Sequence, residues 1–237
     1  MSLADAENWN ILLSVILLIA ALAVIFAPEP YRNIAAVVLA SGPAAAFYLA
    51  RCWPLLFTAI KKKSDPRVDL YWPLMISSFG FLFSSRLSYE ALVSIQYAFL
   101  TSALIATAYC CAYFITVRKR ESFFFLIIPL LYYAISYGYG FTCTANIAVD
   151  DSTPSIYQTT VLDKYITYGK GHNPSDYTLR LRPWGPVNSI SHVRVPAMVY
   201  GSYTPGDTVC LGLHPGLLHL QWYQLVNCPA DDPQAQP

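Results

Sequence analysis

RKRESFFFLIIPLLYYAISYGYGFTC, residues Arg118–Cys143, is the stretch that decides the fold of this chain. Three basic residues open it, and an apolar run from Phe123 to Ile135 follows. Upstream of this stretch the chain is almost continuously apolar, whereas downstream it is polar, alternating and rich in turn residues. We interpret the stretch as the last membrane crossing, which delivers a small β-domain to the side opposite the basic cluster.

The composition agrees with a chain that is largely embedded in a membrane. Of 237 residues, 55% are hydrophobic and only 12% are charged, whereas about a quarter of the residues in a soluble domain are charged. The formal net charge is +1, and no basic run is interleaved with aromatic residues. We therefore expect membrane lipid as a partner and no binding of nucleic acid.

Five apolar segments predict membrane-spanning helices. A hydrocarbon core of about 30 Å needs about 20 apolar residues in a helix, and the predicted spans are 11–27, 34–50, 70–84, 97–117 and 123–139. The third span is short and contains serines, so a re-entrant segment is its alternative. A cleaved signal peptide is the alternative for the first span, but the basic residues that precede such peptides are missing.

Lysine and arginine gather in two connections, and the positive-inside rule places both in the cytoplasm. Five crossings then put the N-terminus in the cytoplasm and residues 143–228 outside the inner (plasma) membrane. If the third segment does not span, the basic clusters decide the orientation rather than the number of spans. The residues that set this topology are Lys61, Lys62, Lys63, Arg67, Arg118, Lys119 and Arg120.

Strand-like alternation begins near Ile156. Leu179 and Leu181 alternate with Arg180 and Arg182, and Pro-Gly and Gly-Pro turns separate this strand from the others. The predicted fold class is an α-helical transmembrane bundle of about five helices (1–142) followed by a small all-β domain, an antiparallel barrel or sandwich (143–228). Residues 229–237 are expected to form a flexible tail.

Three of the six cysteines lie in or beside the predicted β-domain: Cys143, Cys210 and Cys228. An odd number allows one disulfide and one free thiol. We predict that Cys143 pairs with Cys228, because this bridge would close the domain in a compartment where thiols are oxidised.

One charged pair lies beside the third span. Arg86 and Glu90 are spaced i, i+4, as in a helical ion pair. An interfacial pair whose charged ends reach water explains this spacing, and an ion or substrate site at membrane depth is the alternative. With Gly42-Pro43 in the second span, either a close-packing site or a gating hinge, the pair supports a small transporter or channel as an alternative function.

Aromatic residues are abundant in the predicted β-domain. Tyr157, Trp184, Trp222 and Tyr223 form a candidate interaction surface that would stack on sugars or peptides. The alternative is that these residues serve as strand formers or lie at the headgroup level of the bilayer.

No motif predicts catalysis, a metal or a cofactor. Cys210, His214, His219 and Cys228 are zinc-type ligands, but their spacing fits no standard finger, and ordinary surface histidines with a buried Cys210 explain them as well. The residue types of a hydrolase triad are also present, and a membrane-anchored hydrolase is a further alternative, although no nucleophile motif surrounds them. Those three residues are Ser189, His192 and Asp207.

Short motifs at the end of the chain carry a resemblance. They are Asn146, Asp150-Asp151-Ser152, Pro154, Tyr157…Val161…Lys164, Leu181-Arg182-Pro183-Trp184, Pro205-Gly206-Asp207 and Trp222-Tyr223. With the helix count, this part resembles the tail of uncharacterised bacterial multi-pass inner-membrane proteins, in which a few helices precede a small extracytoplasmic β-domain. The resemblance implies location and architecture. We expect a non-catalytic scaffold, accessory or interaction subunit of the cell envelope, whose partners are lipid and another envelope protein or a second copy.

Overall fold

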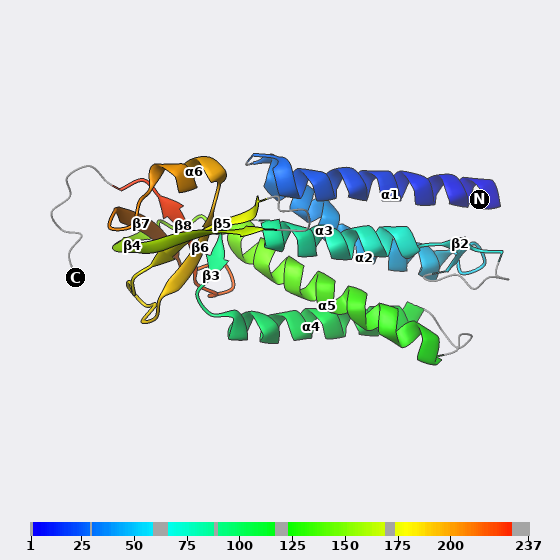
Figure 1. The fold of residues 1–237 in the computed structure, drawn as a ribbon. Coiled ribbons are helices and arrows are strands. Elements are labelled where there is room, and N and C mark those ends of the chain that lie inside the picture. Colours follow the sequence, from blue (N-terminus) through cyan, green and yellow to red (C-terminus); the bar gives the residue numbers. More distant parts are fainter. Residues whose placement is uncertain are drawn as a thin grey trace. The chain divides into compact units, whose positions relative to one another are not determined.

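The computed structural model describes residues 2–28, 30–58, 66–87, 90–116, 123–168 and 174–228. The chain divides into a helical unit, residues 1–87 with 95–149, and a β-unit, residues 88–94 with 150–237 (Figure 1). The predicted combination of a helical part with a β-domain is confirmed. Lys61–Lys63, Arg118–Arg120 and the tail 229–237 lie outside the described residues.

The helical unit contains five helices among its described residues: α1 (Leu3–Phe26), α2 (Tyr31–Cys52), α3 (Tyr71–Leu87), α4 (Ile95–Thr116) and α5 (Phe123–Ala148). The first begins with a capping box, in which the Ser2 hydroxyl accepts a hydrogen bond from Asp5 N and the Asp5 carboxylate accepts one from Ser2 N. Within the described residues, α1, α2 and Gln96–Thr116 of α4 are long and apolar enough to cross a membrane.

Glycines bring neighbouring helices of this unit close together. A Cβ added at Gly138 would lie 2.5 Å from the backbone oxygen of Ser102 in α4, and one added at Gly140 would collide with the backbone of Phe81 in α3. Small residues commonly serve such close packing between membrane helices. The helix α5 continues beyond residue 139, where the predicted span ended, as far as Ala148.

Gly42 and Pro43 are both buried in the middle of α2. A Cβ at Gly42 would collide with the Ser77 hydroxyl of α3 and lie 2.9 Å from Leu17 of α1. In this arrangement Gly42 permits close helix packing, which was one of its two predicted roles. Nearby, Tyr137 Oη of α5 donates a hydrogen bond of 2.8 Å to Ala40 O.

The connection between α2 and α3 contains a small parallel pair, β1 (Phe57–Thr58) and β2 (Val68–Asp69). Arg67 donates to Pro54 O at 3.3 Å. Asn10 Nδ2, near the start of α1, donates to Asp69 O at 2.9 Å. The N-terminal end of α1 and the described parts of the α2–α3 connection therefore lie at the same end of the helical unit.

The β-unit is built on a six-stranded antiparallel sheet, with strand order β3-β8-β7-β4-β5-β6. Residues Ser155–Thr160 of the long strand β4 pair with β7, and Val161–Tyr168 pair with β5, with register shifts between Val161 and Asp163 and between Thr167 and Tyr168. Such an irregularity bends a strand, which gives the sheet its barrel-like curvature. Its elements are β3 (Ala91–Leu92), β4 (Ser155–Tyr168), β5 (Pro174–Leu181), β6 (Ser191–Val195), the short helix α6 (Ala197–Ser202), β7 (Thr208–His214) and β8 (Trp222–Val226).

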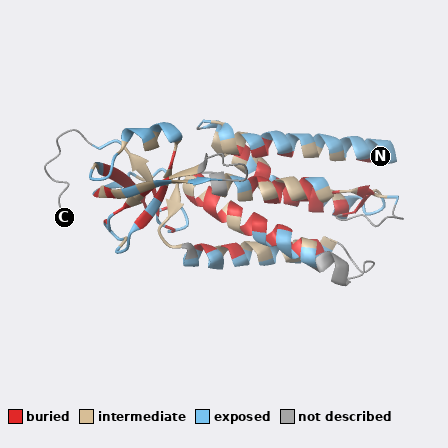
Figure 2. Cartoon of the chain, viewed as in Figure 1, coloured by how far each residue is buried: buried red, intermediate tan, exposed pale blue. Residues whose placement is uncertain are grey.

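Burial in each unit follows the local period of the sequence (Figure 2). In β5, Leu179 and Leu181 are fully buried in the core of the β-unit and lie opposite Val193 and Ser191 of β6. In α1, large aliphatic side chains such as Ile19 remain exposed on the outer side. The strand β6 therefore buries one face and β7 buries both, whereas α1 keeps an apolar face uncovered.

Candidate functional site

A strand from the helical half of the sequence completes the sheet of the β-unit. Ala91 and Leu92 of β3 pair with Tyr223 and Trp222 of β8, and Val93 N donates to Gln221 O at 2.8 Å. The connection between α3 and α4 thus belongs to the β-unit. Sequence patterns do not predict this strand, because two residues are too few to show alternation.

The predicted Arg86–Glu90 pair falls at the end of α3. The helix α3 ends at Leu87, and Glu90 precedes β3, so the two residues do not share a helix. The side chain of Arg86 lies outside the described residues. An i, i+4 ion pair needs both residues within one helix, and the departure of the chain into the sheet removes that condition.

Asp150, the first residue of the β-unit after α5, anchors three separate parts of that unit. Its Oδ2 accepts hydrogen bonds of 2.8 Å from Gly216 N and of 2.8 Å from Trp222 Nε1. Its Oδ1 accepts one of 3.1 Å from Ser152 N. We call Asp150, Ser152, His214, Gly216 and Trp222 the Asp150 cluster. The sequence patterns singled out these five residues for other reasons, Gly216 as part of a Pro-Gly turn, and did not group them.

The donors around Asp150 keep its carboxylate ionised. Partial burial opposes ionisation, but hydrogen bonds from Ser152, Trp222 and Gly216 outweigh it and hold the pKa of Asp150 below its ordinary value. A carboxylate that already accepts from three groups and has a low pKa is a poor proton acceptor at neutral pH. Its arrangement suits a structural anchor.

His214 contributes a buried imidazole to the cluster. Its ring stacks on Trp222, with 4.0 Å between centroids and an angle of 8° between planes. Nδ1 lies 3.2 Å from Ser152 O. Because a carbonyl oxygen only accepts hydrogen bonds, Nδ1 carries a hydrogen and donates it. Nε2 is buried without a hydrogen-bond partner among the described residues.

The predicted disulfide was wrong in one partner. Cys228 bonds to Cys210, with 5.2 Å between Cα atoms, and Cys143 is a buried free thiol. Cys143 lies inside α5, because that helix continues to Ala148. Cys210 in β7 lies opposite Val226 of β8, and this register brings Cys228 within bonding range.

This disulfide also engages two of the four residues that were considered as zinc ligands. Cys210 and Cys228 are bonded to each other, and the His214 ring is committed to Ser152 O and Trp222. Across the residues that the structure describes, no group of three or more His, Cys, Asp and Glu side chains has the proximity that a metal ion needs.

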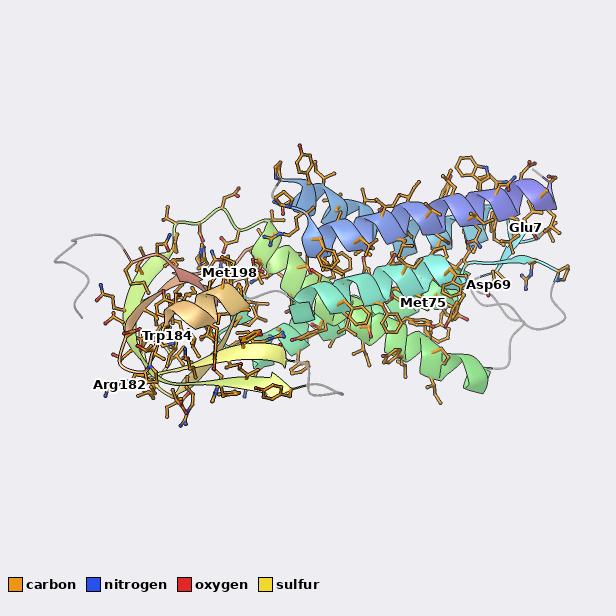
Figure 3. The ribbon with its side chains drawn as sticks, turned by 45° about the horizontal axis from the view of Figure 1, so that its top comes forward. Glu7, Asp69, Met75, Arg182, Trp184 and Met198 are labelled. Carbon is orange, nitrogen blue, oxygen red and sulfur yellow. A yellow bond between two sulfur atoms is a disulfide. The ribbon has the colours of Figure 1, made fainter. Side chains whose placement is uncertain are left out.

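The candidate aromatic surface lies mostly inside the β-unit, contrary to expectation. Trp184 is 4% exposed, Trp222 and Tyr223 are also buried, and Tyr157 is half-buried. Trp184 packs edge-on against Tyr223 at 4.9 Å and donates from Nε1 to Ser191 Oγ at 3.0 Å (Figure 3). Large aromatic side chains gain more from the core than from solvent. The exposed large apolar residues of the β-unit are instead Ile156, Tyr165, Tyr168, Ile190, Met198, Leu217 and Leu218.

The residues considered for a hydrolase have separate roles. Asp207 accepts from Thr204 N at 2.7 Å and from Thr204 Oγ1 at 2.9 Å, which closes the turn before β7. His192 Nδ1 lies 3.3 Å from Tyr165 Oη on an exposed part of the sheet. Ser189 is exposed in the loop before β6. These interactions explain the positions of Asp207 and His192 without a triad.

No protein-family model matches the chain, and neither the curated proteins nor the solved structures contain a significant match. The fold and the Asp150 cluster therefore carry the functional interpretation. The Asp150 cluster joins the first residues of the β-unit to its last hairpin, and that hairpin holds β3. The Asp150 cluster holds the segment that follows α5 against the β7–β8 hairpin.

Proposed function

We propose that this chain is an integral protein of the inner membrane with five crossings, and that it presents the β-unit outside the cytoplasm as a non-catalytic scaffold, accessory or interaction subunit. The observation that carries this proposal is the pairing of β3 with β8. Because β3 lies between α3 and α4, the sheet requires that connection and the C-terminal strands to share one compartment. The hairpin of α4 and α5 then crosses the membrane twice.

The orientation follows from the ends of the helical unit. The Asn10–Asp69 hydrogen bond supports a shared compartment for the start of α1 and the α2–α3 connection. This connection carries Lys61–Lys63, and the α4–α5 connection carries Arg118–Arg120, which favours the cytoplasm for both. With its 17 residues, α3 spans about 25 Å, so a short crossing brings the chain to β3 on the opposite side.

Exposed side chains of the helical unit support lipid as its surroundings. In α1, Ile19 is 62% exposed and Phe26 is 76% exposed, and their exposed neighbours are also large aliphatic residues. A contiguous apolar surface of this kind is rare on soluble proteins. The disulfide between Cys210 and Cys228 supports an oxidising compartment for the β-unit.

The scaffold role rests on how the β-unit uses its polar residues. Asp150 and Asp207 hold turns, and Lys164 Nζ donates to Tyr203 O at 2.7 Å and to Tyr200 O at 3.2 Å, which fastens the α6 segment to β4. A compact domain fixed in this way and tethered to the bilayer suits the display of a surface to another envelope protein.

Accessibility labelling tests the topology. In a variant with Cys52, Cys110, Cys111 and Cys143 replaced by serine, single cysteines are introduced as Lys62→Cys or Asp176→Cys. A membrane-impermeant maleimide applied to intact spheroplasts is expected to label position 176 at once and position 62 only after lysis. Labelling of both positions at the same stage contradicts the topology.

Affinity capture from gently solubilised membranes tests the scaffold role. We expect a second envelope protein, or a second tagged copy of this chain, at a constant ratio to the bait. Recovery of a monomer alone, under conditions that preserve other envelope complexes, contradicts that role and leaves the topology intact.

A further inference from the structure

The turn between β7 and β8 carries two leucines at its tip. His219 N donates to Gly216 O at 3.0 Å, which closes a β-turn with Leu217 and Leu218 at its two central positions. Such positions usually hold Pro, Asp, Asn, Ser or Gly. Here Leu217 is 49% exposed and Leu218 is 36% exposed. Leu217 and Leu218, whose side chains are usually buried, are thus exposed at the surface of the β-unit.

The backbone of this turn is shaped to hold that position. Gly216 has φ +76° and His219 has φ +57°, both in the left-handed region. For a residue with a Cβ this conformation costs about 1–2 kcal/mol. The stacked His214–Trp222 pair closes the base of the same hairpin. The two leucines at the tip are therefore held in their exposed positions by a defined turn.

Hydrogen bonds tie the turn to the point where the chain leaves α5. Gly216 N and Trp222 Nε1 both donate to Asp150, and α5 ends at Ala148. Two peptide units separate these residues, a path of at most about 7.6 Å. If α5 crosses the membrane, as proposed above, these bonds keep the leucine tip within a short reach of the helix end that leaves it.

We propose that Leu217 and Leu218 insert into the boundary between headgroups and acyl chains of the outer leaflet, so that lipid binds the β-unit directly. This inference rests on the proposed membrane topology. A leucine pair gains from burial among acyl chains, and the two residues before it, Pro215 and Gly216, are uncharged. The inserted turn then restricts the distance between the β-unit and the bilayer more than the covalent connection to α5 does alone.

A fluorescent label at the tip tests the insertion. The full chain without its four free cysteines keeps the Cys210–Cys228 bridge and receives Leu217→Cys, labelled with an environment-sensitive dye. Matched variants carry the label at Met198→Cys, where an apolar side chain of α6 is 89% exposed, and at Ile19→Cys on the outer side of α1. Each variant is placed in lipid nanodiscs with or without lipids that carry a quencher on the acyl chain.

We expect quenching and a shift of emission to shorter wavelength at positions 217 and 19, and neither at position 198. An unquenched label at 217 beside a quenched label at 19 overturns the insertion and leaves the membrane crossing intact. A blue-shifted but unquenched label at 217 also overturns it, because protein rather than lipid then covers the turn. An unquenched label at 19 overturns the membrane crossing itself.

A second pair of variants separates insertion from damage to the fold. With the dye at Leu218→Cys, the added substitution Leu217→Ser removes apolar surface at a turn position that accepts serine. We expect less quenching at 218 while the Cys210–Cys228 bridge still forms. Unchanged quenching with an intact bridge contradicts a role for the leucine pair.

Discussion

Trp222 Nε1 donates a 2.8 Å hydrogen bond to Asp150 Oδ2, across 72 positions of the chain. The bond joins a residue two positions after the end of α5 to the first residue of the last strand, β8. Gly216 N reaches the same carboxylate oxygen, and the ring of Trp222 lies flat on His214. These contacts hold the segment that follows α5 against the last hairpin of the β-unit.

Asp150→Asn is expected to destabilise the β-unit by about 1–3 kcal/mol. The substitution removes the charge that accepts from Trp222 and Gly216 and places an amide group among donors, and hydrogen bonds to charged groups contribute about this much. Urea unfolding of the β-unit, followed by tryptophan emission of the full chain in nanodiscs, measures the change. Asp151→Asn at the exposed neighbouring position is the control, and equal losses in both variants contradict the anchor role.

The same carboxylate predicts a loss of stability in acid. The pKa of Asp150 is lowered in the folded state from an ordinary value of 3.8, so its stabilising contribution is complete above that value. The contribution is lost as the pH falls through the folded-state pKa. Unfolding midpoints measured from pH 7 to pH 2 should decline in acid, and the decline should be shallower in Asp150→Asn than in the unchanged chain. Parallel curves for the two proteins would argue against this assignment.

Gly140→Ala is expected to destabilise the helical unit by about 1–3 kcal/mol, the range for overpacking. A Cβ at this position collides with the backbone of Phe81, which cannot move without a shift of α3. Thermal loss of the monodisperse peak in detergent chromatography measures the effect. Gly201→Ala in α6, where a Cβ meets nothing within 4 Å, should change little, and an effect as large as that at Gly140 would refute close packing as the cause.

Cys228→Ser is expected to cost the β-unit about 3 kcal/mol, because the bridge to Cys210 closes a chain segment with a sequence separation of 18. Mass mapping of unreduced peptides should recover Cys210 joined to Cys228 and Cys143 as a free thiol. In Cys143→Ser that bridge should persist. A recovered peptide that joins Cys143 to Cys228 would restore the pairing expected from the sequence.

Trp184→Ala is expected to destabilise the β-unit by about 3–5 kcal/mol, as for other large core side chains. It removes contacts with Tyr157 and Tyr223 and leaves Ser191 Oγ without its donor. Tyr168→Ala, at a side chain that is 58% exposed, should cost little. Denaturant unfolding of both variants tests whether Trp184 is a core residue. Similar small losses of unfolding free energy in the two variants would contradict its place in the core.

Local patterns in the sequence account for much of the fold. The alternation around Leu179 and Leu181 correctly predicted a strand with a buried face, and the long apolar runs predicted the helices that became α1, α2 and α4. Period and apolar length are properties of neighbouring residues, so a sequence displays them directly. The apolar run predicted a span over 123–139, and the helix α5 continues past it to Ala148.

The sequence by itself determined that a helical, apolar part precedes a β-domain, because the spacing of apolar residues along the chain sets both. Only the tertiary structure decided that Cys210 rather than Cys143 bonds to Cys228, that Ala91 and Leu92 become a sheet edge, and that Trp184 lies in the core. Each of these depends on strand register and on contacts between residues far apart in the chain. A local sequence pattern does not specify which residues far apart in the chain will contact each other.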